Sequence, residues 1–276
     1  MPAEDPHAEE LCWERGADGV AWLTLNRPHA GNSITAAQRE ALIARLGEAG
    51  ADPEVRVVVL TGAGSRHFCT GADLGASASA NAGDGEAQKV PGSVSRAIAS
   101  GAQRLIAAVL DCEKPVIAAV NGTAAGIGCH LAYACDLVVA ADSAKFVEIF
   151  ARRGLVVDGA GAYLLTRLVG PQRAKELVFF GDDVSAAEAH RLGLVNAVVP
   201  ARKLTAEAAA LAARLAAGPT IALSLGKRLI NRALDVDRAT ALAEEAMAAE
   251  INMTGADGHE GVRAFLERRD PVFRGR

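Results

Sequence analysis

The 276-residue sequence predicts a mixed α/β protein with a helical C-terminal region. Apolar runs rich in β-branched residues at 20–25, 55–60, 116–120 and 137–140 are typical of buried strands. Helical patterns and turns alternate with these runs, which favours stacked βα-type units over one regular doubly wound sheet. From residue 201 onward, Ala- and Leu-rich amphipathic patterns indicate that the chain is nearly all helix.

The first helix is expected between the first two strands. Residues 35–47 have helical spacing, with Thr35 as a plausible N-cap and Gly50 placed beyond the helix end. Thr35 suits this position because its hydroxyl can accept a hydrogen bond from a free N–H of the first turn.

Length and composition predict one large core with an appendage. Half of the residues are hydrophobic, which is enough for a full core at this length. We therefore divide the chain into a core at 1–200, which holds the ligand site, and a C-terminal helical region at 201–276. The helices expected in that region are 204–216, 221–234, 239–253 and 259–268.

Charge and targeting patterns exclude several classes of partner. A net charge of −4 gives no basic footprint for nucleic acid. The acidic, polar segment 1–6 is unlike a signal or transit peptide, and no apolar run reaches the ~20 residues that span a bilayer. We expect a cytoplasmic protein without a membrane or nucleic-acid partner.

The five cysteines are expected to be buried free thiols. They stand at positions 12, 69, 112, 129 and 135 and form no Cys-x-x-Cys pair. This spacing argues against a zinc site and against a disulfide framework, so we expect no metal.

Two glycine-rich turns, each after an apolar run, are the most informative feature of the chain. The first ends in Gly71-Ala72-Asp73-Leu74 and the second contains Gly126-Ile127-Gly128. Small residues let the backbone approach a ligand, and free N–H groups at a helix start can hold negative charge. If the two turns face each other, they form an oxyanion hole, which stabilises a thioester carbonyl as it becomes an enolate.

Further motifs follow in a fixed order along most of the chain. They include Leu25-Asn26-Arg27-Pro28 with Asn32-Ser33, then 57–62, 68–74, 114–122, 134–137, 168–170 and 193–196. As an ordered series from about residue 20 to 200, they resemble the enoyl-CoA hydratase/isomerase family, also called the crotonase superfamily.

The resemblance implies a fold, a substrate class and an assembly. The fold is a spiral of ββα units whose C-terminal helices close the site and pack against neighbouring subunits. The substrate is an acyl-CoA thioester, with coenzyme A as part of the substrate and no separate cofactor. The assembly is a homotrimer or a dimer of trimers.

The resemblance also assigns site residues by motif position. The oxyanion donors are the backbone N–H groups of Ala72 and Ile127, where many relatives have glycine in place of Ile127. The positions assigned to substrate or CoA contact are Arg27, Ala30, Ala72, Asp73, Leu74, Gly126, Ile127, Lys227 (with neighbouring Arg228) and Phe265.

The acid and base positions depart from the pattern of a hydratase, which uses two glutamates. His130 stands where the first glutamate is expected, and Phe150 stands where the second is expected. Glu148 lies two residues before that second position, on the same face of an extended segment. His130 is either a second proton carrier or only a polar residue of the pocket.

Asp158 is the carboxylate that best matches a catalytic position. It lies in a turn where isomerases of unsaturated or ring-bearing acyl-CoAs carry an aspartate, although an Asx turn or a helix cap is the alternative. One carboxylate beside the thioester can remove a proton and return it elsewhere, and burial would suit its pKa to that work. We therefore expect enoyl-CoA isomerisation with Asp158 and His130 as the catalytic side chains. The alternatives are, in order, 2-enoyl-CoA hydration with a non-standard acid/base set, thioester hydrolysis and non-catalytic acyl-CoA binding.

Overall fold

The computed structural model describes residues 10–73, 75 and 90–276, and its strands form two sheets. The six-stranded sheet has the order β1 (Leu11–Arg15), β2 (Val20–Leu25), β3 (Val57–Gly62), β5 (Val116–Val120), β7 (Leu137–Ala141) and β10 (Ala197–Val199). The four-stranded sheet has the order β4 (His67–Cys69), β6 (Thr123–Ala125), β8 (Lys145–Val147) and β9 (Val184–Ser185). From β2 to β10 the large sheet is parallel, as are β4, β6 and β8.

The chain repeats one pattern that links the two sheets. In each round a strand of the large sheet is followed by a strand of the small sheet and then by a helix. The rounds are β3–β4 with α3 (Ser93–Ile98) and α4 (Arg104–Leu110), β5–β6 with α5 (Ile127–Ala134), and β7–β8 with α6 (Gly161–Phe180). The predicted α/β class with ββα units is thereby confirmed. The repeat is visible in the topology although no short-period repeat marks it in the sequence.

The predicted first helix is present but longer than expected. Helix α1 (Ala36–Ala51) begins after Thr35, whose hydroxyl accepts a hydrogen bond from the backbone N–H of Gln38 at 3.1 Å. Gly50 lies inside the helix, not beyond its end as predicted, because Ala49 and Gly50 are buried against the core. The helix ends at Ala51, and the N–H of the following residue, Asp52, still donates to the carbonyl of Glu48.

The remaining helices complete the core. Helix α6 is broken at Gly170, where φ is 75°, directly before Pro171, a residue that cannot continue the hydrogen-bond ladder. Short helical segments connect the main elements: η1 (Pro28–Ala30), η2 (Ala99–Gln103), η3 (Ala151–Arg153), α7 (Ala186–Arg191) and η4 (Ala201–Lys203).

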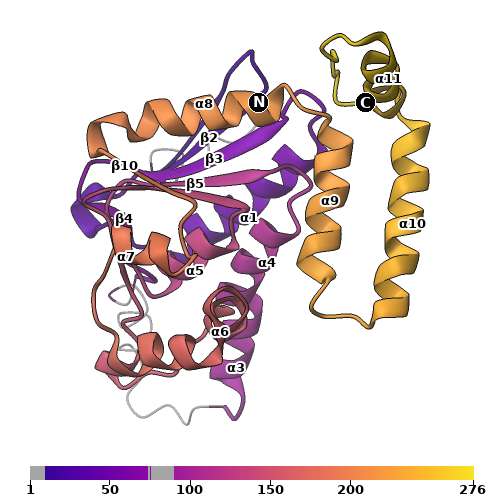
Figure 1. Cartoon of the computed structure of the whole chain (residues 1–276). Coiled ribbons are helices and arrows are strands. Elements are labelled where there is room, and N and C mark those ends of the chain that lie inside the picture. Colours follow the sequence, from indigo (N-terminus) through magenta and orange to yellow (C-terminus); the bar gives the residue numbers. More distant parts are fainter. Residues whose placement is uncertain (1–9, 74, 76–89) are drawn as a thin grey trace, which may run out of the picture.

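The region 201–276 is helical, and its helices pack in two different ways. Helix α8 (Leu204–Ala216) lies along the large sheet (Figure 1), and it buries residues four apart: Leu204, Ala208, Ala212 and Ala216. Helices α9 (Thr220–Arg232), α10 (Arg238–Thr254) and α11 (Ala256–Glu267) stand beside the core as a separate arm (Figure 1). Thus α8 completes the core packing, and the arm begins at α9.

Many apolar side chains of the arm face solvent in this single chain. They include Leu234, Leu242, Met247, Ile251, Phe265 and Leu266. In the described part of the chain, no single helix is long and apolar enough to cross a bilayer. The pair 201–216 and 220–232, bent by 105°, meets that test only by length and composition.

Candidate active site

A cavity of about 330 Å³ lies beyond the C-terminal ends of the parallel strands β4, β6 and β8. Each strand leads directly into a segment of its wall: 70–73 after β4, 126–127 after β6 and 149–150 after β8. Ligands bind at the carboxyl ends of parallel strands in many α/β proteins, because the loops there converge. The lining residues are Ser33, Thr70, Gly71, Ala72, Asp73, Ala102, Gly126, Ile127, Ile149, Phe150, Arg153, Leu155 and Asp158.

The backbone N–H of Ala72 is free of the bridge that holds its segment. Ile34 and Ala72 form an isolated parallel bridge, in which Ile34 N–H donates to Gly71 O and Asp73 N–H donates to Ile34 O. Successive peptide groups of an extended segment point to opposite sides, so the N–H of Ala72 points away from Ile34. Ala72 lines the cavity.

The backbone N–H of Ile127 has no hydrogen-bond acceptor within its own helix. Ile127 is the first residue of α5, and the first N–H groups of a helix have no acceptor within the helix. Gly126, with φ 54° and ψ −123°, makes the turn into the helix, a conformation that side chains disfavour. A Cβ built on Gly71 would lie 4.0 Å from the Ile127 nitrogen and 3.2 Å from Ala125 O, so the two glycine-rich turns abut.

Asp73 and Asp158 are the carboxylates in the described lining, and their surroundings differ. Asp73 Oδ2 accepts a 2.8 Å hydrogen bond from Arg27 Nη1, and the same guanidinium nitrogen donates to Ser33 O. Arg27 is only 12% exposed, so this ion pair fixes the first turn from behind. The charge of Asp73 is therefore balanced by Arg27.

Asp158 is the cavity carboxylate without an ion-pair partner among the described residues. Burial raises the pKa of its carboxyl above the ordinary value, and the nearby His130 opposes that rise. The turn around it is tight: Gly161 N–H donates to Asp158 O, and Ala160 takes φ 62°. Asp158 is therefore a partly buried base candidate held at the cavity wall.

His130 lies behind the wall and is bound to Glu148. Its Nε2 is 3.0 Å from Glu148 Oε2, and the two side chains are 0% and 4% exposed. The imidazole stacks on Phe150, with ring centroids 5.4 Å apart and planes 5° from parallel. Phe150 lines the cavity, whereas His130 and Glu148 are one layer deeper.

The register of the small sheet explains why these two side chains meet. Ala125 of β6 pairs with Val147 of β8, and Gly126 N–H donates to Val147 O. Glu148 is thus the first residue after its strand, and His130 is one turn into the helix that follows the neighbouring strand. Both residues are candidates by sequence, but no sequence pattern predicts their pairing. The signal was the parallel order of their strands, which the sequence does not reveal.

Arg27 and Ala30 lie on the segment that leads to the cavity wall. Ala30 is at the end of η1, and its N–H donates to Arg27 O. Neither residue lines the cavity itself. Leu74 lies outside the described residues.

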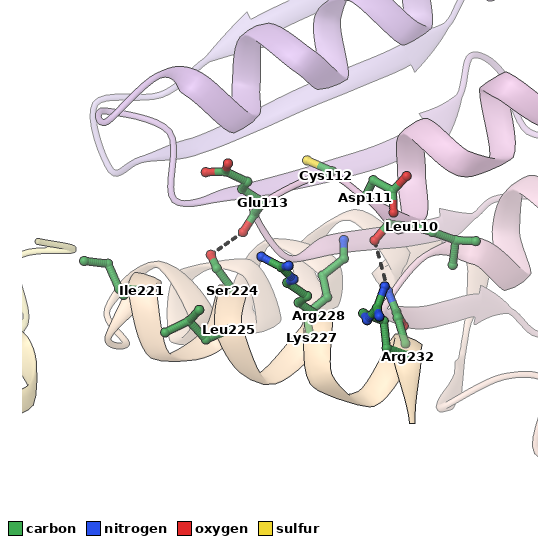
Figure 2. A pocket seen from close by; sticks show the side chains of 11 residues that line it. Leu110, Asp111, Cys112, Glu113, Ile221, Ser224, Leu225, Lys227, Arg228 and Arg232 are labelled. Atoms are coloured by element: carbon green, nitrogen blue, oxygen red, sulfur yellow. Dashed lines mark hydrogen bonds between the residues drawn. The ribbon is translucent and has the colours of Figure 1, made fainter. Parts of the chain in front are cut away.

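Lys227 lies at a different place, in a cavity of about 560 Å³ between α9 and the segment 110–113 (Figure 2). Its ammonium pairs with Asp136 Oδ2 at 2.9 Å and donates to Val109 O and Lys114 O. This cavity lies just before the first residue of β5. The candidate site lies after the last residue of β6, the next strand along the chain. Phe265 is 82% exposed on α11. The structure thus gathers Ala72, Asp73, Gly126, Ile127 and Asp158 in one cavity, but Lys227 and Phe265 are elsewhere in this single chain.

The chain is similar to known acyl-CoA enzymes. The sequence model of the enoyl-CoA hydratase/isomerase family matches residues 15–276. The 1,2-epoxyphenylacetyl-CoA isomerase of Escherichia coli is 40% identical over 94% of this chain and 96% of its own. The short-chain-enoyl-CoA hydratase of Clostridium acetobutylicum is 35% identical over 91% and 92%.

A solved structure shows the same fold. The enoyl-CoA hydratase from Bacillus anthracis superposes with a TM-score of 0.85 at 35% identity, over 97% of this chain and 100% of that one. Matches of this extent cover the core and the C-terminal arm together. The chain belongs to the enoyl-CoA hydratase/isomerase (crotonase) family of acyl-CoA enzymes.

Proposed function

We propose that this protein isomerises the double bond of an enoyl-CoA, with Asp158 as the acid and base. The observation that carries the proposal is the single carboxylate without an ion-pair partner in the described cavity wall, in the same cavity that Ala72 and Ile127 line. Coenzyme A belongs to the substrate, and the proposed chemistry needs no separate cofactor.

In the proposed reaction on a 3-enoyl-CoA, Asp158 removes one proton from the carbon next to the thioester carbonyl; with a 2-enoyl-CoA the same steps run in reverse, and Asp158 takes the proton from the γ-carbon. The negative charge moves to the carbonyl oxygen, where the N–H groups of Ala72 and Ile127 stabilise it. The double bond then shifts by one position, and the protonated Asp158 returns its proton to the γ-carbon. Each such donor is worth roughly 3–4 kcal/mol in an oxyanion hole. The raised pKa of Asp158 suits a group that must take and release a proton near neutral pH.

Hydration is less well supported by this cavity. Adding water across a double bond needs one group to activate the water and one to deliver a proton. Phe150 occupies the wall where a second carboxylate is expected, and Glu148 is turned inward onto His130. Hydration with Asp158, His130 and Glu148 in non-standard roles therefore remains the second proposal.

A ring-bearing acyl-CoA is a second candidate for the substrate of the isomerisation. The Escherichia coli relative is named for 1,2-epoxyphenylacetyl-CoA, and isomerisation of such a compound needs no added water. The cavity wall offers apolar contacts from Ile127, Ile149, Phe150 and Leu155. These side chains fit an aromatic or alkyl acyl group.

We further propose that the chain assembles as a trimer or a dimer of trimers through its arm. A monomer would leave the arm's large apolar side chains in water, including Met247 at 66% and Phe265 at 82% exposure. Light scattering of the purified protein tests this directly. CoA contacts from Lys227 and Phe265 remain predictions for the assembled protein.

The decisive experiment is mass spectrometry of a medium-chain 2-enoyl-CoA incubated with the protein in heavy water. Deuterium that enters the acyl chain without added water supports isomerisation, and Asp158→Asn should abolish it. Gain of a whole heavy-water molecule would mean hydration, and release of free CoA would mean hydrolysis. Tight CoA-thioester binding without any of these changes would favour a non-catalytic binder.

A further inference from the structure

The wall of the candidate site carries a cation that the proposed reaction does not use. Arg153, the last residue of η3, lines the cavity together with Asp158. Its guanidinium forms no ion pair with any residue that the structure describes, whereas the other arginine near the cavity, Arg27, is paired with Asp73. The positive charge of Arg153 is thus free to meet a ligand.

The preceding residue, Arg152, has different surroundings. Its Nη1 donates to Gly181 O at 3.3 Å and lies 3.9 Å from Asp183 Oδ1, and Arg152 does not line the cavity. One arginine of the pair is therefore held at the end of α6, and Arg153 serves the cavity side. A free guanidinium offers a planar set of N–H donors that matches a carboxylate with two parallel hydrogen bonds.

The strand order of the small sheet shows on which side of the cavity Arg153 lies. Strand β6 lies between β4 and β8, so segment 126–127 lies between segment 70–73 and the wall that follows β8. The thioester carbonyl is expected where 70–73 meets 126–127. Contacts to CoA are expected from Arg27, which is tied to the β4 side through Asp73. Arg153 lies on the β8 side.

The β8 side is where the acyl group must extend. Asp158 has to reach the α- and γ-carbons in the proposed isomerisation, and it follows β8 on the same segment as Arg153. Ile149, Phe150 and Leu155 of this segment offer apolar contacts to an acyl chain. Arg153 therefore belongs to the wall that contacts the acyl group and not to the CoA side.

We propose that Arg153 binds a carboxylate at the far end of the acyl group, so that the substrates are CoA esters of dicarboxylic acids. The inference rests on the proposed function, because it names the substrate class of the same cavity. Arg153 is exposed to solvent. The second carboxylate would therefore stay close to water while the chain before it lies on apolar side chains, which avoids the cost of burying a charge.

The charges of the wall give this residue its selectivity. Asp73 is neutralised by Arg27, but Asp158 has no ion-pair partner among the described residues and repels a second carboxylate when it is ionised. Arg153 offsets this repulsion and adds an attractive pair. A plain alkyl chain gains nothing from the guanidinium, so Arg153 discriminates between the two kinds of acyl group.

The test is calorimetric titration of the full-length protein with two pairs of saturated CoA esters. Adipyl-CoA is compared with hexanoyl-CoA, and octanedioyl-CoA with octanoyl-CoA; the members of each pair differ only in the terminal carboxylate. Arg153→Met should weaken binding of at least one dicarboxylic ester by about tenfold and leave the alkyl esters unchanged. Arg153→Lys keeps the charge without the planar donor set and should lose less affinity than Arg153→Met.

Arg152→Met is the matched control, because it removes the adjacent cation from outside the cavity and should leave all four affinities unchanged. Equal losses for dicarboxylic and alkyl esters in Arg153→Met, or a loss for free CoA, would assign Arg153 to the CoA moiety and overturn the inference. Unchanged affinity for both dicarboxylic esters would overturn it as well.

These titrations are independent of turnover, because none of the four esters has a double bond. If wild type catalyses no deuterium exchange into any enoyl-CoA, the proposed isomerisation fails, and the titrations still decide what Arg153 binds. If exchange occurs but Arg153→Met binds the dicarboxylic esters as wild type does, only the substrate class fails.

Discussion

Gly161 lies against the imidazole of His130 so closely that no methyl group fits between them: a Cβ there would be 2.2 Å from Nε2 and 2.3 Å from Cε1. Gly161 is the first residue of α6, so its missing side chain lets α6 approach α5. Because Nε2 is held by Glu148 and the ring by Phe150, the imidazole has little freedom to move aside.

Gly161→Ala should therefore destabilise the fold by about 1–3 kcal/mol through overpacking. In an open helical position the same change stabilises, because alanine loses less backbone entropy on folding. Gly226 of α9 offers that control, since a Cβ there meets nothing within 4 Å. Urea denaturation should show opposite signs for the two variants. Equal effects would mean that His130 yields to the added methyl group.

Asp158→Asn should raise stability while it removes activity. The pKa of Asp158 is raised in the folded protein above its ordinary value of 3.8. Below pH 3.8 the carboxyl is protonated in both the folded and unfolded states. Ionisation of residue 158 should then cause no difference in stability between wild type and Asp158→Asn. Above the folded pKa the wild type buries a charge that the variant lacks, so the variant's advantage should grow as pH rises through that window.

Thermal unfolding at several pH values checks this prediction. A constant difference in Tm between Asp158→Asn and wild type would contradict it. The rate should show the complementary behaviour, rising with pH as Asp158 ionises and becoming a competent base.

Lys227→Met should destabilise the protein by about 2–4 kcal/mol, because it leaves Asp136 largely buried without its cation. It also removes the bonds to Val109 O and Lys114 O that hold α9 against the core. Arg228→Met is the matched control for stability only: it removes an exposed cation from the same helix and the same cavity but breaks no buried ion pair.

Chemical denaturation and calorimetric CoA binding together separate the two roles of Lys227. Loss of CoA affinity with unchanged stability would show that the lysine serves the ligand and not the docking of α9. Loss of stability with unchanged CoA affinity would show the reverse.

Cys69 and Cys129 should resist alkylation although both lie in the glycine-rich turns. Both are 0% exposed, and burial raises the pKa of the Cys69 thiol to about 12, so the reactive thiolate is scarce. Cys12 is partly exposed and should be modified first. Mass spectrometry of peptides after brief iodoacetamide treatment measures the order. Early labelling of Cys69 or Cys129 would mean that the turns open in solution.

The fold was largely predictable because its strongest signals are local. The strands at 20–25 and 116–120 have the predicted bounds, and Thr35 caps α1 through a contact three residues away. The end of α1 was predicted wrongly, since burial of Gly50 is a tertiary effect that outweighs its weak helix propensity.

The placement of two predicted site residues in one cavity follows from backbone and chain order. Ala72 and Ile127 lie just after β4 and β6, so their convergence depends on the parallel arrangement of these strands. The pairing of His130 with Glu148 depends on which strands are neighbours. The partner of Lys227 is ninety-one positions away, and no local pattern identifies Asp136.

The N–H groups of Ala72 and Ile127 belong to the main chain, so their persistence does not depend on which side chains these positions carry. Asp158, His130 and Phe150 can each be exchanged by single mutations, and each stands on a different segment of the same cavity or just behind it. If the proposed roles hold, a lineage with this scaffold can change its proton chemistry in small steps and keep the two backbone donors. Because the backbone N–H groups persist while the side chains can change, the cavity is a good starting point for directed evolution toward other thioester reactions.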